Sequence, residues 1–168
     1  IAELAQLAQT DVVGGDTIRS VGPLTLGVTV LGRVAADECL TRSGGKPGDA
    51  IFVTGTLGRA AAGFHALEAG RDIPAELRPG VDAQLRPQPR LAAARALASS
   101  RLVTAMMDLS DGVATDLHRL CRASAAGAVV SADRLPIDPV VSHTCAWLRD
   151  EGAGELDPIH LALTGGED

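Results

Sequence analysis

Apolar residues recur along the chain with two periods, one typical of helices and one typical of strands. The helical period predicts helices over residues 1–9, 59–69, 89–99 and 140–151, and one more from Val113 past Cys121. Short apolar or alternating runs predict strands that begin at residue 11 or span residues 24–32, 50–53, 102–107, 128–131 and 161–163. Residues 72–89 and 133–139 are predicted loops. This order predicts a mixed α/β fold without the regular β-α-β alternation of a doubly wound sheet.

The stretch from Met106 to Gly112 holds more acidic residues than a helix cap requires. It joins the predicted strand 102–107 to the helix that starts near Val113, and it contains Asp108, Ser110 and Asp111. Ser110 or Asp111 could cap the helix, but Asp108 lies too far ahead of it. Carboxylates next to a core are costly unless they are paired or bound to a cation. The end of a strand in an α/β protein is a common ligand position, so we predict a ligand or metal site here.

Two other turns share this design of glycine followed by a carboxylate. They are Gly14 to Thr17 and Gly165 to Asp168, and each taken alone is compatible with an ordinary turn. Clustered carboxylates without His or Cys favour Mg²⁺ over Zn²⁺. Magnesium sites combine few carboxylates with substrate phosphates, which indicates a nucleotide as companion. A glycosidase carboxylate pair fits less well, because such sites use aromatic platforms and the chain has one Trp.

Composition narrows the function classes. The chain has 168 residues, enough for one domain or parts of two, with 46% apolar and 2% aromatic residues and a net charge of −6. Scarce aromatics and scattered arginines argue against nucleic-acid binding, and the sequence has no apolar run long enough for a membrane span. Three cysteines without C-x-x-C spacing favour reduced thiols and a cytoplasmic location. His118 and Cys121 lack a second ligand pair, so we do not expect zinc there.

A domain boundary is expected where residues 33–48 change character and include the run R-S-G-G-K-P-G. We place it between residues 1–37 and 38–168. Lys46 lies in a turn without the order of a P-loop, and the glycines at 55 and 58 give only a weak signal for anion binding. The sequence starts within a predicted helix and stops directly after a predicted strand, so we expect a piece of a longer protein.

Six motifs, taken together, carry a resemblance to a known family. They are G-G-D-T (14–17), L-T-R-S-G-G-K-P-G-D (40–49), V-T-G-T-L-G (53–58), P-x-P-R (87–90), M-D-L-S-D-G-V-A-x-D-L (107–117) and T-G-G-E-D (164–168). In this order they resemble the thiamine-monophosphate kinases of the aminoimidazole-ribonucleotide-synthetase-like superfamily. The resemblance implies a two-domain architecture, with residues 1–37 ending an N-terminal nucleotide-binding and dimerising domain. Residues 38–168 would form a truncated C-terminal α/β domain.

The resemblance also implies an activity and a set of site residues. The activity is ATP-dependent phosphorylation of thiamine monophosphate to thiamine diphosphate in a cytoplasmic homodimer that uses several Mg²⁺ ions. The residues implied to bind ATP are Gly15, Asp16, Arg42 and Ser110. Those implied to hold magnesium are Asp16, Asp108 and Asp111, and Glu167 would lie at the thiamine end of the site.

Elementary chemistry agrees with that activity. The acceptor is an ionised phosphate, so no general base is expected, and none of the four histidines (His65, His118, His143, His160) has the setting of one. Further magnesium aspartates of the family would lie outside the chain, so the 168 residues alone should be inactive. Two alternatives stay open: another ATP-dependent enzyme of the superfamily, of the aminoimidazole ribonucleotide synthetase or selenophosphate synthetase type, or a non-catalytic Mg²⁺- and nucleotide-binding module.

Overall fold

The computed structural model describes residues 1–167 and divides the chain into two compact units, Ile1–Asp37 and Glu38–Asp168. The first unit contains helix α1 (Ala2–Leu7), and the rest of it has no regular secondary structure. Its apolar side chains are exposed, among them Leu24, Val28 and Val30.

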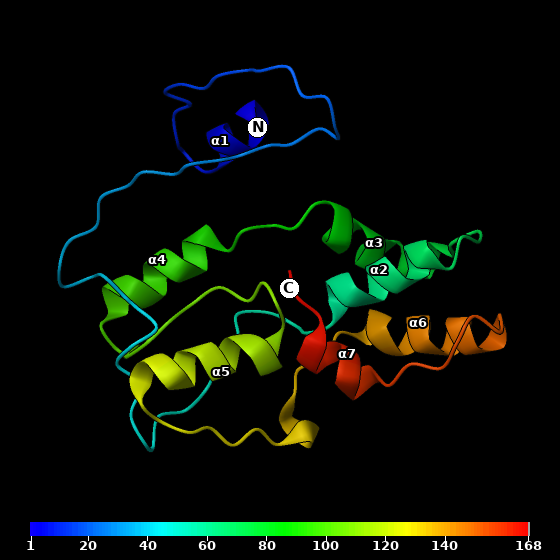
Figure 1. Ribbon diagram of the computed structural model, residues 1–168. Helices are drawn as coiled ribbons and strands as arrows, with labels where there is room; N and C mark the ends of the chain where they lie inside the picture. Colours follow the sequence, from blue (N-terminus) through cyan, green and yellow to red (C-terminus); the bar gives the residue numbers. More distant parts are fainter. Residues whose placement is uncertain (168) are drawn as a thin grey trace. The chain divides into compact units, whose positions relative to one another are not determined.

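The second unit is built from helices (Figure 1). Their bounds are α2 (Arg59–Glu68), the 3₁₀ turn η1 (Ala75–Leu77), α3 (Arg78–Leu85), α4 (Leu91–Ser100), α5 (Val113–Ser124), the 3₁₀ turn η2 (Ala132–Arg134), α6 (Pro139–Asp150) and α7 (Pro158–Thr164). None of the helices within residues 1–167 is long and apolar enough to cross a bilayer.

The core of the second unit lies where α2, α6, α7 and η1 meet. One cluster joins Ala62, Leu77, Val141 and Leu161, with Trp147 packed against it from its edge. A second cluster joins residues from α5, α7 and the segment before α2: Leu57, Val113 and Ala162, with Leu109 and Leu117 at its border. The second cluster therefore anchors the start of α5, directly beyond the acidic stretch.

Aspartate followed by proline starts both α6 and α7. The carboxylates of Asp138 and Asp157 accept hydrogen bonds from the N–H groups of Val140 (3.0 Å) and Ile159 (3.1 Å). The proline in each case occupies the first turn, where no N–H partner is needed. The start of α7 corrects the prediction of a strand over 161–163, because the cap and the proline select a helix for the apolar run that follows.

The other predicted strands are also absent from residues 1–167, where the only reported bridge is the isolated pair Leu57 and Ile137. A strand needs a neighbouring backbone to pair with, and side chains such as Leu24 and Val28 are 86% and 73% exposed, without a covering partner. The predicted loop 72–89 is wrong as well, because Leu77 and Val81 are buried one helical turn apart in η1 and α3. The predicted helices correspond to α1, α2, α4, α5 and α6.

Two glycines allow α2 and α3 to touch. A Cβ added at Gly63 would collide with the carbonyl group of Gly80, and one added at Gly80 would lie 3.1 Å from the Arg59 oxygen. The backbones of the two helices therefore approach as closely as they do only because both positions lack a side chain (Figure 1).

We expect Gly63→Ala to lower the free energy of unfolding by up to about 2 kcal/mol, because overpacking typically costs about 1–3 kcal/mol and alanine's higher helix propensity offsets about 1 kcal/mol of that cost. The measurement is the urea midpoint of the intact protein. Gly127→Ala is the matched control, since a Cβ at Gly127 meets nothing within 4 Å. A midpoint raised by Gly63→Ala would contradict the contact.

Candidate functional site

The acidic stretch 108–112 is held by a buried carboxylate from the helix that follows it. Asp116 is only 1% exposed, and its Oδ2 accepts hydrogen bonds from the backbone N–H groups of Ser110 (3.0 Å) and Asp111 (2.8 Å). Gly112 precedes α5 with φ +95°, a conformation that suits glycine. The segment thus turns sharply into the helix, and the backbone N–H groups of Ser110 and Asp111 are both directed at Asp116.

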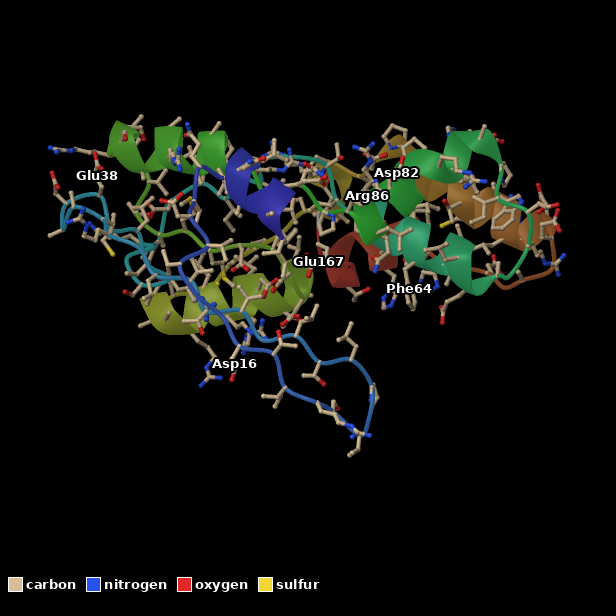
Figure 2. The ribbon with its side chains drawn as sticks, turned by 90° about the horizontal axis from the view of Figure 1, so that it is seen from above. Asp16, Glu38, Phe64, Asp82, Arg86 and Glu167 are labelled. Carbon is tan, nitrogen blue, oxygen red and sulfur yellow. The ribbon has the colours of Figure 1, made fainter. Side chains whose placement is uncertain are left out.

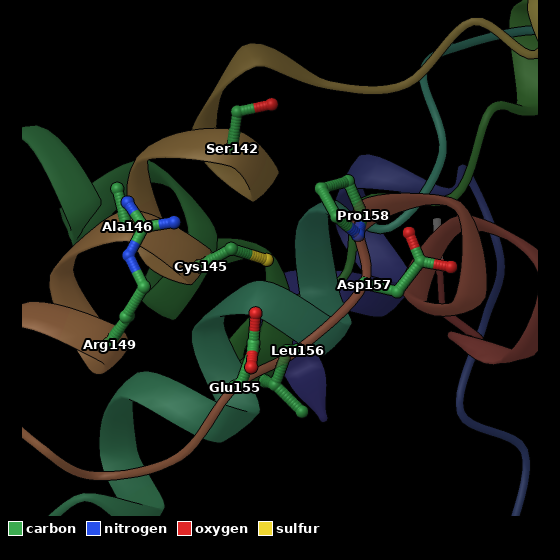
Figure 3. Close-up of a pocket in the computed structure, with 8 residues that line it drawn as sticks. All are labelled: Ser142, Cys145, Ala146, Arg149, Glu155, Leu156, Asp157 and Pro158. Atoms are coloured by element: carbon green, nitrogen blue, oxygen red, sulfur yellow. The ribbon is translucent and has the colours of Figure 1, made fainter.

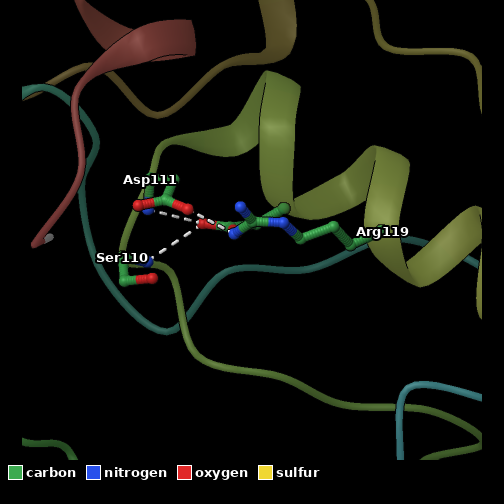
Figure 4. A network of polar contacts seen from close by, with 4 residues as sticks. Ser110, Asp111 and Arg119 are labelled. Atoms are coloured by element: carbon green, nitrogen blue, oxygen red, sulfur yellow. Dashed lines mark hydrogen bonds and ion pairs between the residues drawn. The ribbon is translucent and has the colours of Figure 1, made fainter.

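Arg119 bridges two of the aspartates in this region (Figure 4). Its Nη1 donates to Oδ1 of Asp116 at 2.8 Å and also to Oδ2 of Asp111. The hydrogen bond to Asp111 is the main reason why the pKa of Arg119 is raised above its ordinary value. Asp111 and Arg119 are both about half exposed, at 50% and 44%. The ion pair with Asp111 therefore stands at the surface, open to a competing cation.

The third predicted acidic turn packs directly against the second. A Cβ on Gly166 would collide with the carbonyl group of Ser110, and one on Gly112 would lie 2.7 Å from the carbonyl carbon of Thr164. The N–H of Glu167 donates to the carbonyl oxygen of Leu109 at 3.2 Å, and Glu167 itself has φ +64°. The end of α7 is therefore tied to the turn before α5, and the exposed Glu167 follows it (Figure 2).

The loop that contains Arg42 is hydrogen bonded at two places: to Met106, just ahead of the acidic stretch, and to Ser124, at the end of α5. The N–H of Met106 donates to the Thr41 carbonyl at 2.9 Å, and the Ser124 hydroxyl donates to the Arg42 carbonyl at 2.9 Å. The Thr104 hydroxyl donates to Asp49 at 2.7 Å, and this bond is the main cause of the lowered pKa of the Asp49 carboxyl. The backbone of Arg42 is thereby fixed, and its side chain is exposed.

The structure brings some of the predicted site residues together and leaves others apart. The segments of Asp108, Ser110, Asp111 and Glu167 are in backbone contact, and the loop of Arg42 is hydrogen bonded to residue 106. Gly15 and Asp16 belong to the first unit, where both are exposed. Asp168 lies outside the described residues.

The carboxylates of the two contacting turns suit a hard cation that also binds water and phosphate oxygens. Within residues 1–167 no group of three or more His, Cys, Asp or Glu side chains is close enough to hold a metal ion alone. Asp108 and Asp111 offer exposed carboxylate oxygens, and Mg²⁺ is commonly held by one or two carboxylates together with water and substrate phosphates. The two turns therefore fit part of a magnesium–phosphate site.

Sequence reasoning missed Asp116 and Arg119. A signal existed for Asp116, because it lies on the apolar face of α5 beside Val113 and Leu117, where a carboxylate needs an explanation. Arg119 carried no such signal, since an exposed arginine on a helix is ordinary and only the fold shows that it spans Asp111 and Asp116.

A cavity of about 530 Å³ lies elsewhere in the second unit, between α6 and the segment before α7 (Figure 3). Ser142, Cys145, Ala146 and Arg149 line it from one face of α6, with helical spacing, and residues 155–158 line the other side. Burial raises the pKa of the Cys145 thiol, Asp157 adds to the effect and Arg149 opposes it. A protonated thiol is a poor nucleophile, so this environment does not favour a reactive Cys145.

Comparison with known proteins defines the class. Residues 46–150 match the family described as AIR synthase related protein, C-terminal domain, and the chain belongs to this family. Within it, the relatives are thiamine-monophosphate kinases: the one from Salmonella typhimurium is 39% identical over 93% of this chain and 45% of its own length. The one from Halobacterium salinarum is 36% identical over 93% of this chain and 47% of its own length.

Solved structures agree with the sequence relatives. The thiamine-monophosphate kinase from Stenotrophomonas maltophilia superposes with a TM-score of 0.68 at 30% identity, over 80% of this chain and 42% of its own. A structure described as "AaThiL complexed with AMPPCP and TMP" superposes with a TM-score of 0.67 at 30% identity, over 77% of this chain and 40% of its own. The predicted family and its aminoimidazole-ribonucleotide-synthetase-like fold are confirmed, although the described residues form helices and no regular strand. The chain spans about half the length of the curated relatives it matches.

We expect the Cys145 thiol to react with iodoacetamide on the order of tenfold more slowly than the exposed Cys39, because burial disfavours the thiolate and blocks access. The contribution of this thiol to stability is complete below its ordinary pKa of 9.0 and is lost as the pH rises through the raised folded-state value. Peptide mass spectrometry of a timed alkylation measures both rates in one sample. Equal rates would refute the assignment.

Proposed function

We propose that the protein transfers the γ-phosphoryl group of ATP to thiamine monophosphate, with Mg²⁺, to form thiamine diphosphate. The observation that supports this best is the backbone contact between the turn of Asp108 and Asp111 and the turn of Glu167. The relatives bear the name of this kinase, and one solved relative is described as complexed with AMPPCP and TMP. Free thiols at Cys39, Cys121 and Cys145 agree with a cytoplasmic enzyme.

Each site residue has a role in the proposed reaction. In the second unit, Asp108 and Asp111 would hold Mg²⁺ through exposed oxygens. In the first unit, the family resemblance assigns a magnesium contact and a nucleotide contact to Asp16 and a nucleotide contact to Gly15. Ser110 would contact the nucleotide and Arg42 the ATP phosphates, since guanidinium groups bind phosphates in a bidentate manner. Glu167 would face the thiamine end. Magnesium, when bound, screens the repulsion between two polyanions and aligns the in-line transfer.

The chain's own groups have to position and neutralise rather than abstract a proton. The acceptor phosphate is ionised at neutral pH, so a general base is not required. His65 pairs with Glu68 at 3.5 Å on α2, and no described histidine belongs to the turns 108–112 or 164–167. Phosphoryl transfer to a phosphate relies on positioning and charge stabilisation rather than on proton abstraction.

We further propose a homodimer formed through residues 1–37. This unit exposes an alternating apolar row that includes Leu24, Leu26, Val28 and Val30, each at least 70% exposed. Exposed apolar patches of this kind mark interaction sites, and a second copy of the same unit is the partner that the family resemblance implies.

Asp108→Asn and Asp111→Asn in the intact protein should each lower kcat for thiamine monophosphate by about 10²-fold or more, because each removes charge that stabilises the transition state. Circular dichroism should stay unchanged, since both side chains are exposed. Asp133→Asn, in η2, is the control and should retain activity.

Near-normal turnover in both variants would contradict the proposal that Asp108 and Asp111 bind magnesium. Calorimetry with ATP and Mg²⁺ separates the remaining alternatives. Nucleotide binding without turnover of thiamine monophosphate would favour a non-catalytic module, and turnover of another substrate of the superfamily would favour a different enzyme of that group.

Val28→Glu should shift the intact protein from dimer to monomer in multi-angle light scattering, because a charge in an apolar interface is left without its water. Thr29→Glu places the same charge at the neighbouring polar position, outside the apolar row, and should leave the dimer intact. A wild-type protein that is monomeric at micromolar concentration would contradict the proposal.

A further inference from the structure

We propose that Asp116 is a positioning residue for the turn of Ser110 and Asp111, and that it holds Arg119 beside Asp111 as a counter-ion that a bound cation displaces. The inference rests on the proposed function, because the cation in question is the one that Asp111 would bind. It assigns roles to Asp116 and Arg119, which are not predicted ligands themselves but contact the predicted ligand Asp111.

The geometry of Asp116 makes it a fixed point for the turn. Its own N–H donates to the Gly112 carbonyl at 2.9 Å within the first turn of α5, and its side chain is 1% exposed. One of its oxygens accepts the N–H groups of two consecutive residues, Ser110 and Asp111. Two hydrogen bonds to one atom fix the orientation of both peptide planes, and with them the direction in which the Asp111 side chain leaves the backbone.

Arg119 completes the arrangement from the solvent side. A buried carboxylate needs donors for both oxygens, and Arg119 serves the second oxygen of Asp116 at 2.8 Å. The same Nη1 reaches Asp111, whose side chain is 50% exposed (Figure 4). Because Asp116 keeps a hold on Arg119, Asp111 can exchange the guanidinium for a cation while Arg119 stays paired. A guanidinium in this place repels the incoming cation and lowers its affinity.

A purely structural role for Asp116 makes a different prediction. If the carboxylate only capped the start of α5, its removal would lower stability and leave cation affinity in the folded protein unchanged. Binding therefore has to be measured well below the unfolding transition, and by a readout other than turnover. Partners that orient a metal ligand typically change metal affinity or activity by about 10–100-fold when they are removed.

The experiment titrates the intact protein with Mn²⁺, a paramagnetic substitute for Mg²⁺, and follows the free ion by electron paramagnetic resonance. The sites of interest are those that Asp111→Asn abolishes. Asp116→Ala should weaken these sites by about 10–100-fold with an unchanged circular dichroism spectrum. Arg119→Gln should bind Mn²⁺ at least as tightly as the wild type, because the competing charge is gone. Asp82→Ala, on the exposed side of α3 (Figure 2), is the control.

Wild-type Mn²⁺ affinity in Asp116→Ala would overturn the positioning role, and weakened binding in Arg119→Gln would overturn the counter-ion role. Should Asp116→Ala fail to fold, Asp116→Asn keeps one oxygen for the two N–H groups and loses the charge that holds Arg119. Arg119 is then left with Asp111 as its carboxylate partner, so a cation can displace it only by leaving the guanidinium unpaired. Binding must therefore weaken by about tenfold, and unchanged binding refutes the proposal. If Asp111→Asn itself leaves Mn²⁺ binding intact, the proposed function fails instead, and the two failures are thus distinguished.

Discussion

Close approach of the end of α7 to the turn before α5 is the constraint on which the candidate site depends. Leu161 and Ala162 fix α7 in the two core clusters, and the chain then passes Ser110 at a distance that only a glycine at position 166 permits. Glu167 follows with its N–H bound to Leu109. Core packing therefore sets the spacing of the acidic turns, and a change in the core would reach the site through these backbone contacts.

Hydrogen bonds and an ion pair around Asp116 add to the effect of that packing. The carboxylate of Asp116 is tolerated at 1% exposure because three donors surround it, two from the backbone and one from Arg119. Asp111 lies at the edge of the same network and stays half exposed. One aspartate is thus committed to the fold while its neighbour remains available to a ligand. Both residues are aspartates, so the division follows from their places: Asp116 is buried in the first turn of α5, whereas Asp111 lies in the exposed turn ahead of it.

Local sequence signals predicted the helices better than the strands. Helices α2, α4, α5 and α6 follow from apolar spacing within one segment, whereas a strand depends on a partner far along the chain, and the runs 50–53 and 128–131 have no regular pairing within residues 1–167. The helix α7 was mistaken for a strand because its apolar core is short, and the Asp157–Pro158 start outweighs that pattern. Asp108, Ser110, Asp111 and Glu167 could be singled out as polar residues at element ends. Asp116 could have been noticed as a carboxylate on the apolar face of its helix, but its bonds to the turn, and the role of Arg119, arise from contacts that only the fold shows.

Exposed carboxylates suit the proposed reaction between two phosphates, which depends on positioned charge rather than on proton abstraction. A buried, perturbed acid or base serves proton abstraction, and neither Asp108 nor Asp111 is buried. What such a reaction needs is charge held at fixed positions, and the structure provides this through backbone contacts at Gly112 and Gly166 and through Asp116. Precision in this site therefore resides in the peptide groups next to the candidate ligands, and the residues that set it are two glycines, Gly112 and Gly166, and the buried Asp116.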